Sequence, residues 1–140
     1  KKNGQIKFRE YTNGVREFYW EGRLNSRHFP GGSVENFYKN GNIKKRLNLN
    51  PTEIKEYFEN GQLKSLYNDK CKSIYHQNGQ LQTKRYINDN KLQIEENYDQ
   101  YGQLTSQTHW NDHQIESVIY FNNGKKIDGN FKKLINLSAF

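Results

Sequence analysis

Few residues in this chain have the types and spacing of a catalytic or metal site. His109 and His113 lie four positions apart, the spacing that places two zinc ligands on one face of a helix. Asn111 and Asp112 between them are turn formers, however, and no His-Glu-x-x-His motif is present. Two solvated histidines beside a hairpin turn are therefore the better interpretation.

The carboxylates offer no stronger candidate. Glu95 and Glu96 are adjacent, and adjacent residues of a strand point to opposite faces, so they cannot act on one substrate. Glu53, Glu56 and Glu59 are interpreted as a polar strand face. The sequence lacks a glycine-rich phosphate loop that leads into a helix, and it lacks serine nucleophile motifs. We therefore expect a protein that is not an enzyme, without metal ligands or cofactors.

A basic and aromatic set near the start of the chain is the best candidate for binding. With a two-residue turn at Asn13-Gly14, one face of the first hairpin carries both kinds of side chain, because Lys7, Arg9 and Tyr11 lie opposite Trp20, Phe18 and Arg16. Such a face suits an acidic protein, a phosphate chain or anionic headgroups. The alternative is that the aromatics pack beneath arginine stems as ordinary core. The predicted partner-binding residues are Lys7, Arg9, Tyr11, Arg16, Phe18, Trp20 and Arg23.

The charge distribution agrees with this placement. The chain of 140 residues has a net charge of +7, and the whole excess lies in residues 1–50, which hold 11 Lys and Arg against four acids. The remaining residues are balanced. Such asymmetry indicates a partner and says nothing about the fold.

Six Asn-Gly pairs divide the chain, at residues 3–4, 13–14, 40–41, 60–61, 78–79 and 123–124. Asn-Gly between short apolar runs predicts a two-residue hairpin turn with positive φ at both positions. From Gly41 to Gly124 the landmark glycines follow at intervals of 20, 18, 23 and 22 residues, and Asn- and Asp-rich turns are predicted between them at 68–70, 88–90 and 111–113. The expected cross-strand pairs are Phe58 with Leu63, Tyr38 with Ile43, Val34 with Leu47, and His76 with Leu81.

The composition favours a sheet without a large core. Only 32% of the residues are hydrophobic, and they are mainly aromatic and β-branched. One hairpin is marginal in water, so neighbouring hairpins must stack. We predict an all-β fold: an elongated, twisted, single-layer antiparallel meander of about a dozen strands. Residues 1–140 form one repeat domain, with hairpin repeats over about 4–128 and a last strand or cap over 129–140. The single cysteine, Cys71, is expected to be a partly buried strand residue.

The clearest repeat reads Tyr57-Phe58-Glu59-Asn60-Gly61-Gln62-Leu63-Lys64. The pattern aromatic-aromatic-x-Asn-Gly-x-Leu/Ile-Lys resembles the variant MORN repeat of bacterial proteins, including YwqK-type antitoxins, over roughly 125 residues. Local departures affect the register: Gly14-Val15 lacks the spacer before the aliphatic residue, and Gly124 is followed by one residue too many. The resemblance implies an extended β-meander used for binding or assembly, and the antitoxin subtype implies a protein to be neutralised.

The leading functional hypothesis is a non-enzymatic scaffold that binds a protein partner, either a different protein or a second copy of this chain. One alternative is peripheral association with an anionic membrane or another polyanion through the basic aromatic face, although sequence-specific nucleic-acid binding is not expected. Another is a targeting or spacer region of a larger protein. No apolar stretch is long enough for a transmembrane helix. Because the chain starts at Lys1 and contains no methionine, we expect a removed leader or a longer parent protein, and we favour an extracytoplasmic location over a cytoplasmic one.

Overall fold

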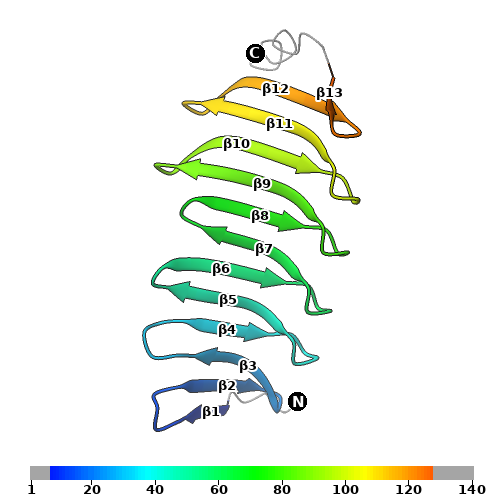
Figure 1. Ribbon diagram of the computed structural model, residues 1–140. Coiled ribbons are helices and arrows are strands. Elements are labelled where there is room, and N and C mark those ends of the chain that lie inside the picture. Colours follow the sequence, from blue (N-terminus) through cyan, green and yellow to red (C-terminus); the bar gives the residue numbers. More distant parts are fainter. Residues whose placement is uncertain (1–6, 128–140) are drawn as a thin grey trace. The chain divides into compact units, whose positions relative to one another are not determined.

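The computed structural model describes residues 7–127, and this part of the chain contains strands and turns but no helix (Figure 1). Its 13 strands follow one another in an antiparallel meander in the order in which they occur in the sequence. They are β1 (Lys7–Glu10), β2 (Arg16–Trp20), β3 (Arg23–His28), β4 (Val34–Phe37), β5 (Ile43–Leu49), β6 (Thr52–Tyr57), β7 (Leu63–Asn68), β8 (Cys71–Tyr75), β9 (Leu81–Asn88), β10 (Lys91–Tyr98), β11 (Leu104–Asn111), β12 (Gln114–Asn122) and β13 (Lys125–Lys126). The predicted all-β meander is confirmed.

The chain divides into two compact units, Lys1–Leu66 and Tyr67–Phe140, which are described separately below as unit 1 and unit 2. The predicted turn at Asn3-Gly4 and the predicted cap over 129–140 lie outside the described residues. Cys71 begins β8 as a free, partly buried residue, as expected.

Most Asn-Gly pairs form a longer loop than predicted. In the repeat around Asn60, the Phe58 amide donates to the Gln62 carbonyl at 2.8 Å and the Gly61 amide donates to the Phe58 carbonyl at 2.9 Å. Gly61 has a φ of +89°, whereas Asn60 is not in the left-handed region. Asn60 instead accepts a hydrogen bond from the Gln62 amide through Oδ1 at 3.0 Å. This side-chain bond favours a three-residue loop that ends in a left-handed glycine.

Two-residue turns with positive φ occur elsewhere. Asn123 and Gly124 have φ values of 49° and 74°, so this Asn-Gly pair is confirmed as the predicted type. The predicted polar turns over 88–90 and 111–113 have the same geometry, because two consecutive residues of each adopt positive φ. Asn and Asp tolerate this conformation better than most residues.

In the β4–β5, β8–β9 and β10–β11 hairpins a bulge beside the longer loop restores the register of the strand body. In the β4–β5 hairpin Phe37 faces Ile43, whereas Val34 faces Leu47, and the register shifts by one residue between these pairs. The predicted Val34–Leu47 pair is therefore confirmed, and the predicted pairing of Tyr38 with Ile43 is wrong. The β8–β9 hairpin behaves in the same way.

The other two predicted pairs differ for the same physical reason. Leu81 faces Tyr75 where His76 was expected. Phe58 bonds to Gln62 across the loop and does not face Leu63. The three-residue loop moves the aromatic partner by one position, but aromatic–aliphatic pairing itself is retained next to the loop.

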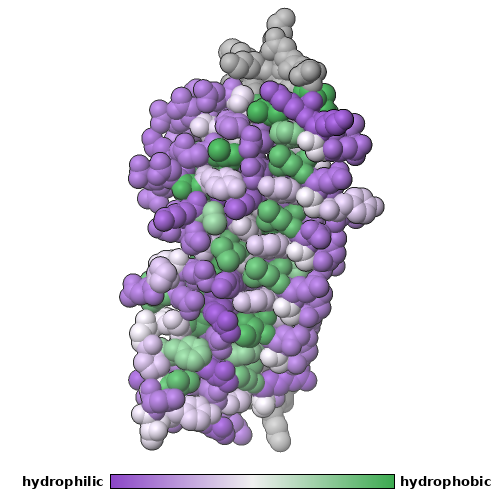
Figure 2. Space-filling model, viewed as in Figure 1, coloured by the Kyte–Doolittle hydropathy of each residue, from purple (hydrophilic) through white to green (hydrophobic). Residues whose placement is uncertain are grey.

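The buried side chains of residues 7–127 are polar, and no hydrophobic side chain in this range is buried. The buried residues are Glu17, Ser26, Glu35, Ser73 and Thr83. A single layer of strands has no second layer to cover its large side chains, so these remain partly exposed. Figure 2 shows hydrophobic side chains at the visible surface of each unit, beside hydrophilic ones.

Side chains in the turns connect successive repeats. In unit 1 the Tyr38 hydroxyl donates to the Tyr57 carbonyl at 2.7 Å, and Asn40 Nδ2 donates to the Glu59 carbonyl at 2.9 Å. In unit 2 Asn78 Nδ2 donates to the carbonyl of Gln100 at 2.8 Å. Asn40 and Asn78 thus each stabilise their own turn and also satisfy a backbone carbonyl of the next turn.

Candidate binding surface

The first hairpin has a different register from the one predicted. β1 and β2 pair Lys7 with Tyr19, Phe8 with Phe18, Arg9 with Glu17, and Glu10 with Arg16. The loop at Asn13-Gly14 has three residues, because the Tyr11 amide donates to the Val15 carbonyl at 2.9 Å, and no bulge follows it. A shift of one residue moves every side chain of a strand to the other face relative to its partner.

The predicted basic aromatic set is consequently divided between the two faces of unit 1. Lys7, Arg9 and Tyr11 lie on one face. Arg16, Phe18 and Trp20 lie on the other, and Arg23 pairs with Trp20. The prediction that all seven share one face is wrong, because it assumed a two-residue loop. Their role in binding stays a prediction.

The face that carries Lys7 and Arg9 contains a row of alternating charges, which we call the ladder face. Successive strands β1 to β5 pair Arg9, Glu17, Arg27, Glu35 and Arg46 across the sheet. Arg27 Nη2 lies 2.8 Å from Glu17 Oε1, and Arg46 Nη2 lies 2.7 Å from Glu35 Oε1. Each buried carboxylate in this row therefore has a guanidinium partner.

Glu17 is the most strongly held of these carboxylates. Its Oε2 accepts from the hydroxyls of Tyr19 at 2.5 Å and Tyr11 at 2.7 Å, while Oε1 accepts from Arg27 Nε at 2.9 Å. The hydrogen bonds from Tyr19 and Tyr11, followed by that from Arg27, lower the pKa of Glu17 to about 2. The hydrogen bond between Tyr19 and Glu17 also raises the pKa of Tyr19. This side of the hairpin is a satisfied structural cluster.

Unit 2 contains a similar arrangement. Glu96 Oε2 accepts from the Tyr98 hydroxyl at 2.7 Å and the Tyr86 hydroxyl at 3.3 Å, and Gln107 donates to Oε1 at 3.0 Å. Burial, together with the bond to Glu96, raises the pKa of Tyr98. Glu95 instead contacts Arg85 at 2.6 Å. The different partners of Glu95 and Glu96 confirm that these neighbours point to opposite faces.

The opposite face of unit 1 carries Phe8, Phe18, Trp20, Ser26 and His28, and we call it the aromatic face. The Phe18 ring lies 5.3 Å from the Phe8 ring and 4.8 Å from the His28 ring, measured between centroids. Phe8 and Trp20 are 53% and 45% exposed. Among residues 7–127, these two rings therefore stay about half exposed, whereas the carboxylates Glu17 and Glu35 of the ladder face are buried.

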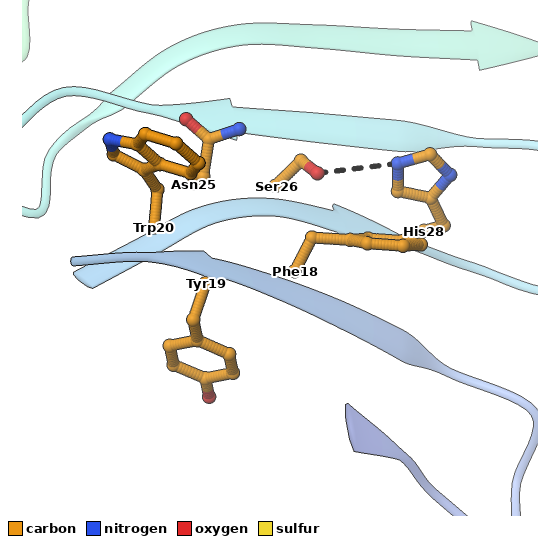
Figure 3. Close-up of a pocket in the computed structure, with 6 residues that line it drawn as sticks. All are labelled: Phe18, Tyr19, Trp20, Asn25, Ser26 and His28. Carbon is orange, nitrogen blue, oxygen red and sulfur yellow. Dashed lines mark hydrogen bonds between the residues drawn. The ribbon is translucent and has the colours of Figure 1, made fainter. Parts of the chain in front are cut away.

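A hollow of about 520 Å³ opens on the aromatic face (Figure 3). It is lined by Phe18, Tyr19, Trp20, Asn25, Ser26 and His28. Figure 3 shows the Tyr19 side chain pointing to the opposite side of the strand from the other labelled side chains, in agreement with the alternation along β2. A second hollow of about 330 Å³ shares Phe18 and His28 with the first and extends toward Pro30.

The two histidines considered as metal ligands lie at the end of β11 and in the turn that follows it. His109 lies 2.9 Å from the Gln107 side chain, and His113 has a φ of 65° in the turn after β11. Across residues 7–127 no group of three or more His, Cys, Asp or Glu side chains is arranged to hold a metal ion. The same range contains no helix long and apolar enough to cross a membrane.

Residues 30–50 and 52–68 match the family model of the MORN repeat variant. The two segments span β4 to β7 and contain the Asn40-Gly41 and Asn60-Gly61 loops. The comparison with curated proteins gives no match.

MORN repeats commonly take part in protein or membrane-lipid interaction, and an all-β meander of this kind is typically non-catalytic. The matched repeats thus agree with a role in binding. The sequence did not predict that Asn25, Ser26 and His28 line a hollow. The one available signal was the missing spacer after Gly14, which indicated an altered register in the first hairpin.

Proposed function

We propose that this chain is a non-enzymatic repeat scaffold that binds a protein partner through the aromatic face of unit 1. The observation that carries this proposal is the exposure of Phe8 and Trp20, at 53% and 45%, on one face. Phe8 pairs with Phe18 across the strands, and Trp20 and Phe18 line a hollow. Exposed aromatic clusters with nearby arginines are typical of protein-binding surfaces. The buried ladder carboxylates, in contrast, already have their hydrogen-bond partners.

A polyanion is less well supported as the partner. Binding to phosphates or headgroups depends on several free cations on one surface. Lys7 and Arg9 lie on the ladder face, away from Arg16 and Arg23, and Arg16 contacts Glu10 at 3.2 Å. The division of these charges weakens the case for an anionic surface.

Site-specific photo-cross-linking in the source cell tests the proposal. A photoreactive phenylalanine analogue replaces Trp20 in one variant and Tyr101 in a control, because Tyr101 is 77% exposed but belongs to unit 2. We expect a defined adduct from position 20 only. The captured protein is then purified, and its affinity is measured by calorimetry for the native chain, Trp20→Ala and Tyr101→Ala.

The proposal predicts that Trp20→Ala weakens binding about tenfold or more while Tyr101→Ala does not. Sedimentation analysis shows whether the captured partner is a second copy of the chain. Equal binding by both variants, or the absence of any defined adduct at position 20, would contradict the proposal.

A further inference from the structure

A β-bulge places two consecutive residues of β3 on the aromatic face. Phe18 faces Ser26 and Tyr19 faces Leu24, so Asn25 is the extra residue. Successive residues of a regular strand would point to opposite faces. In Figure 3 the Asn25 and Ser26 side chains both lie on the side of Trp20. Bulges commonly redirect a side chain in this way next to functional sites.

The hairpins with two-residue turns have a bulge at the corresponding position. The extra residue is Asn25 in β3, Gln93 in β10 and Glu116 in β12, so a polar side chain occupies this position each time. The Asn25 amide has no hydrogen bond within residues 7–127. It is an exposed, unengaged amide at the edge of an aromatic hollow.

The polar groups of the hollow limit the ligands that fit it. Ser26 is 8% exposed, and its hydroxyl lies 3.3 Å from His28 Nε2, so these two groups pair with each other. The Asn25 amide and the second ring nitrogen of His28, Nδ1, remain available among the aromatic rings. A sugar presents many hydroxyls and needs several partners. One amide matches one peptide group, because each has an N–H donor and a C=O acceptor.

Charge at the ends of the hollow indicates the character of this peptide. Arg23 pairs with Trp20 across the β2–β3 hairpin, and Arg16 pairs with His28 at the other end of the same strands. Arg16 contacts Glu10, whereas Arg23 has no ion pair within the described range. A carboxylate of the ligand would complement Arg23 beside Trp20.

We propose that the hollow on the aromatic face binds an aromatic side chain of an acidic, extended segment in a partner protein. The anchor ring occupies the space between Phe18, Trp20 and His28, and the Asn25 amide bonds to the backbone of the segment. A carboxylate next to the anchor contacts Arg23. The adjoining hollow toward Pro30 accommodates the residues that follow. This inference rests on the proposed function and specifies the partner's chemistry.

Nuclear magnetic resonance titration with synthetic peptides tests the inference. The probes are Glu-Glu-Trp-Glu-Glu, the same peptide with alanine as the anchor, and Lys-Lys-Trp-Lys-Lys, all with blocked ends. We expect Glu-Glu-Trp-Glu-Glu to shift the indole N–H signal of Trp20 and the side-chain amide signals of Asn25. The alanine and lysine peptides are expected to bind about tenfold more weakly.

Variants of the chain complete the test. Trp20→Ala and Asn25→Leu should each weaken the acidic peptide, Arg23→Glu should reverse the preference between acidic and basic peptides, and Tyr101→Ala should have no effect. Signal dispersion in each spectrum shows that the variant is folded, and Asn25→Leu tests the exposed amide if Trp20→Ala does not fold.

The outcomes separate this inference from the proposed function. Failure of the acidic peptide to shift Trp20 and Asn25 overturns the inference, even if a protein is captured at position 20 and the proposed function stands. Stronger binding of the basic peptide, or saturation of the hollow by a simple disaccharide or a mononucleotide, also overturns it. Peptide binding without any captured protein leaves the hollow's specificity supported and contradicts the proposed scaffold role.

Discussion

Replacing Glu17 with glutamine tests whether the ladder face stabilises unit 1. Glu17 is 5% exposed and accepts hydrogen bonds from Tyr11, Tyr19 and Arg27. Glutamine keeps one oxygen for the tyrosines, but it removes the charge and turns an N–H group toward the Arg27 guanidinium. Hydrogen bonds to charged groups contribute about 1.5–3 kcal/mol each, and we expect Glu17→Gln to lower the free energy of unfolding by about 2 kcal/mol.

Glu10→Gln is the matched control, because it makes the same chemical change in the same hairpin. The Glu10–Arg16 pair has a separation of 3.2 Å, but its side chains are 49% and 57% exposed. Exposed ion pairs contribute about 0–1 kcal/mol. The control should therefore change the free energy of unfolding by about 0.5 kcal/mol or less.

Urea denaturation followed by tryptophan fluorescence measures both variants, at neutral and at acidic pH. The pKa of Glu17 is lowered to about 2 in the folded chain, so the unfolded chain binds this proton first as the pH falls. The stabilisation is complete above the ordinary glutamate pKa of about 4.3 and is lost as the pH falls toward about 2. Glu17→Gln should lack this part of the acid sensitivity. Equal destabilisation by the two variants, or an unchanged acid response in Glu17→Gln, would refute the reasoning.

Three further predictions concern the turns and the second unit. Asn40→Asp keeps the side-chain acceptor for its own turn but loses the N–H donor to the Glu59 carbonyl of the next turn. It should therefore lower the free energy of unfolding, measured by urea denaturation, by about 1 kcal/mol. Asn13→Asp should lower it less, because the Asn13 side chain acts as the acceptor in its own turn. Gly32→Ala should destabilise more than Gly41→Ala: both have a φ of +90°, but an added Cβ at residue 32 would lie 2.5 Å from a leucine methyl, whereas the site at 41 is open. Equal thermal shifts for the two alanine variants would contradict this. In an alkaline titration followed by phenolate absorbance, Tyr98 should ionise at a higher pH than free tyrosine, and Tyr98→Phe should remove that late phase from the titration curve.

The fold could be predicted from the sequence because each hairpin carries two consistent signals. The Asn-Gly pairs locate the turns, and the flanking aromatic and aliphatic residues indicate which side chains meet. The pairing of Val34 with Leu47 was predicted correctly although the loop type was wrong. The β4–β5 hairpin has a three-residue loop followed by a bulge at Lys44, and this combination gives the strand body the register of a two-residue loop.

The candidate site could be predicted only in part because no bulge between β1 and β2 restores the register of a two-residue loop. All four pairs between β1 and β2 follow the register of the three-residue loop, without a bulge. A one-residue difference therefore separates Lys7 and Arg9 from Phe18 and Trp20. Asn25 could not be assigned to the aromatic face for a related reason, since its orientation depends on a bulge that local propensity does not specify.

The distribution of stabilising contacts explains how unit 1 can expose an aromatic face. Its buried groups are polar, and the two buried carboxylates, Glu17 and Glu35, are paired with arginines on the ladder face. Turn side chains such as Asn40 add bonds between repeats. A unit held by these contacts does not require Trp20 or Phe8 to be covered. Both rings are therefore available for binding. Substitution of Trp20 or Phe8 should lower the affinity for a partner more than it lowers the free energy of unfolding.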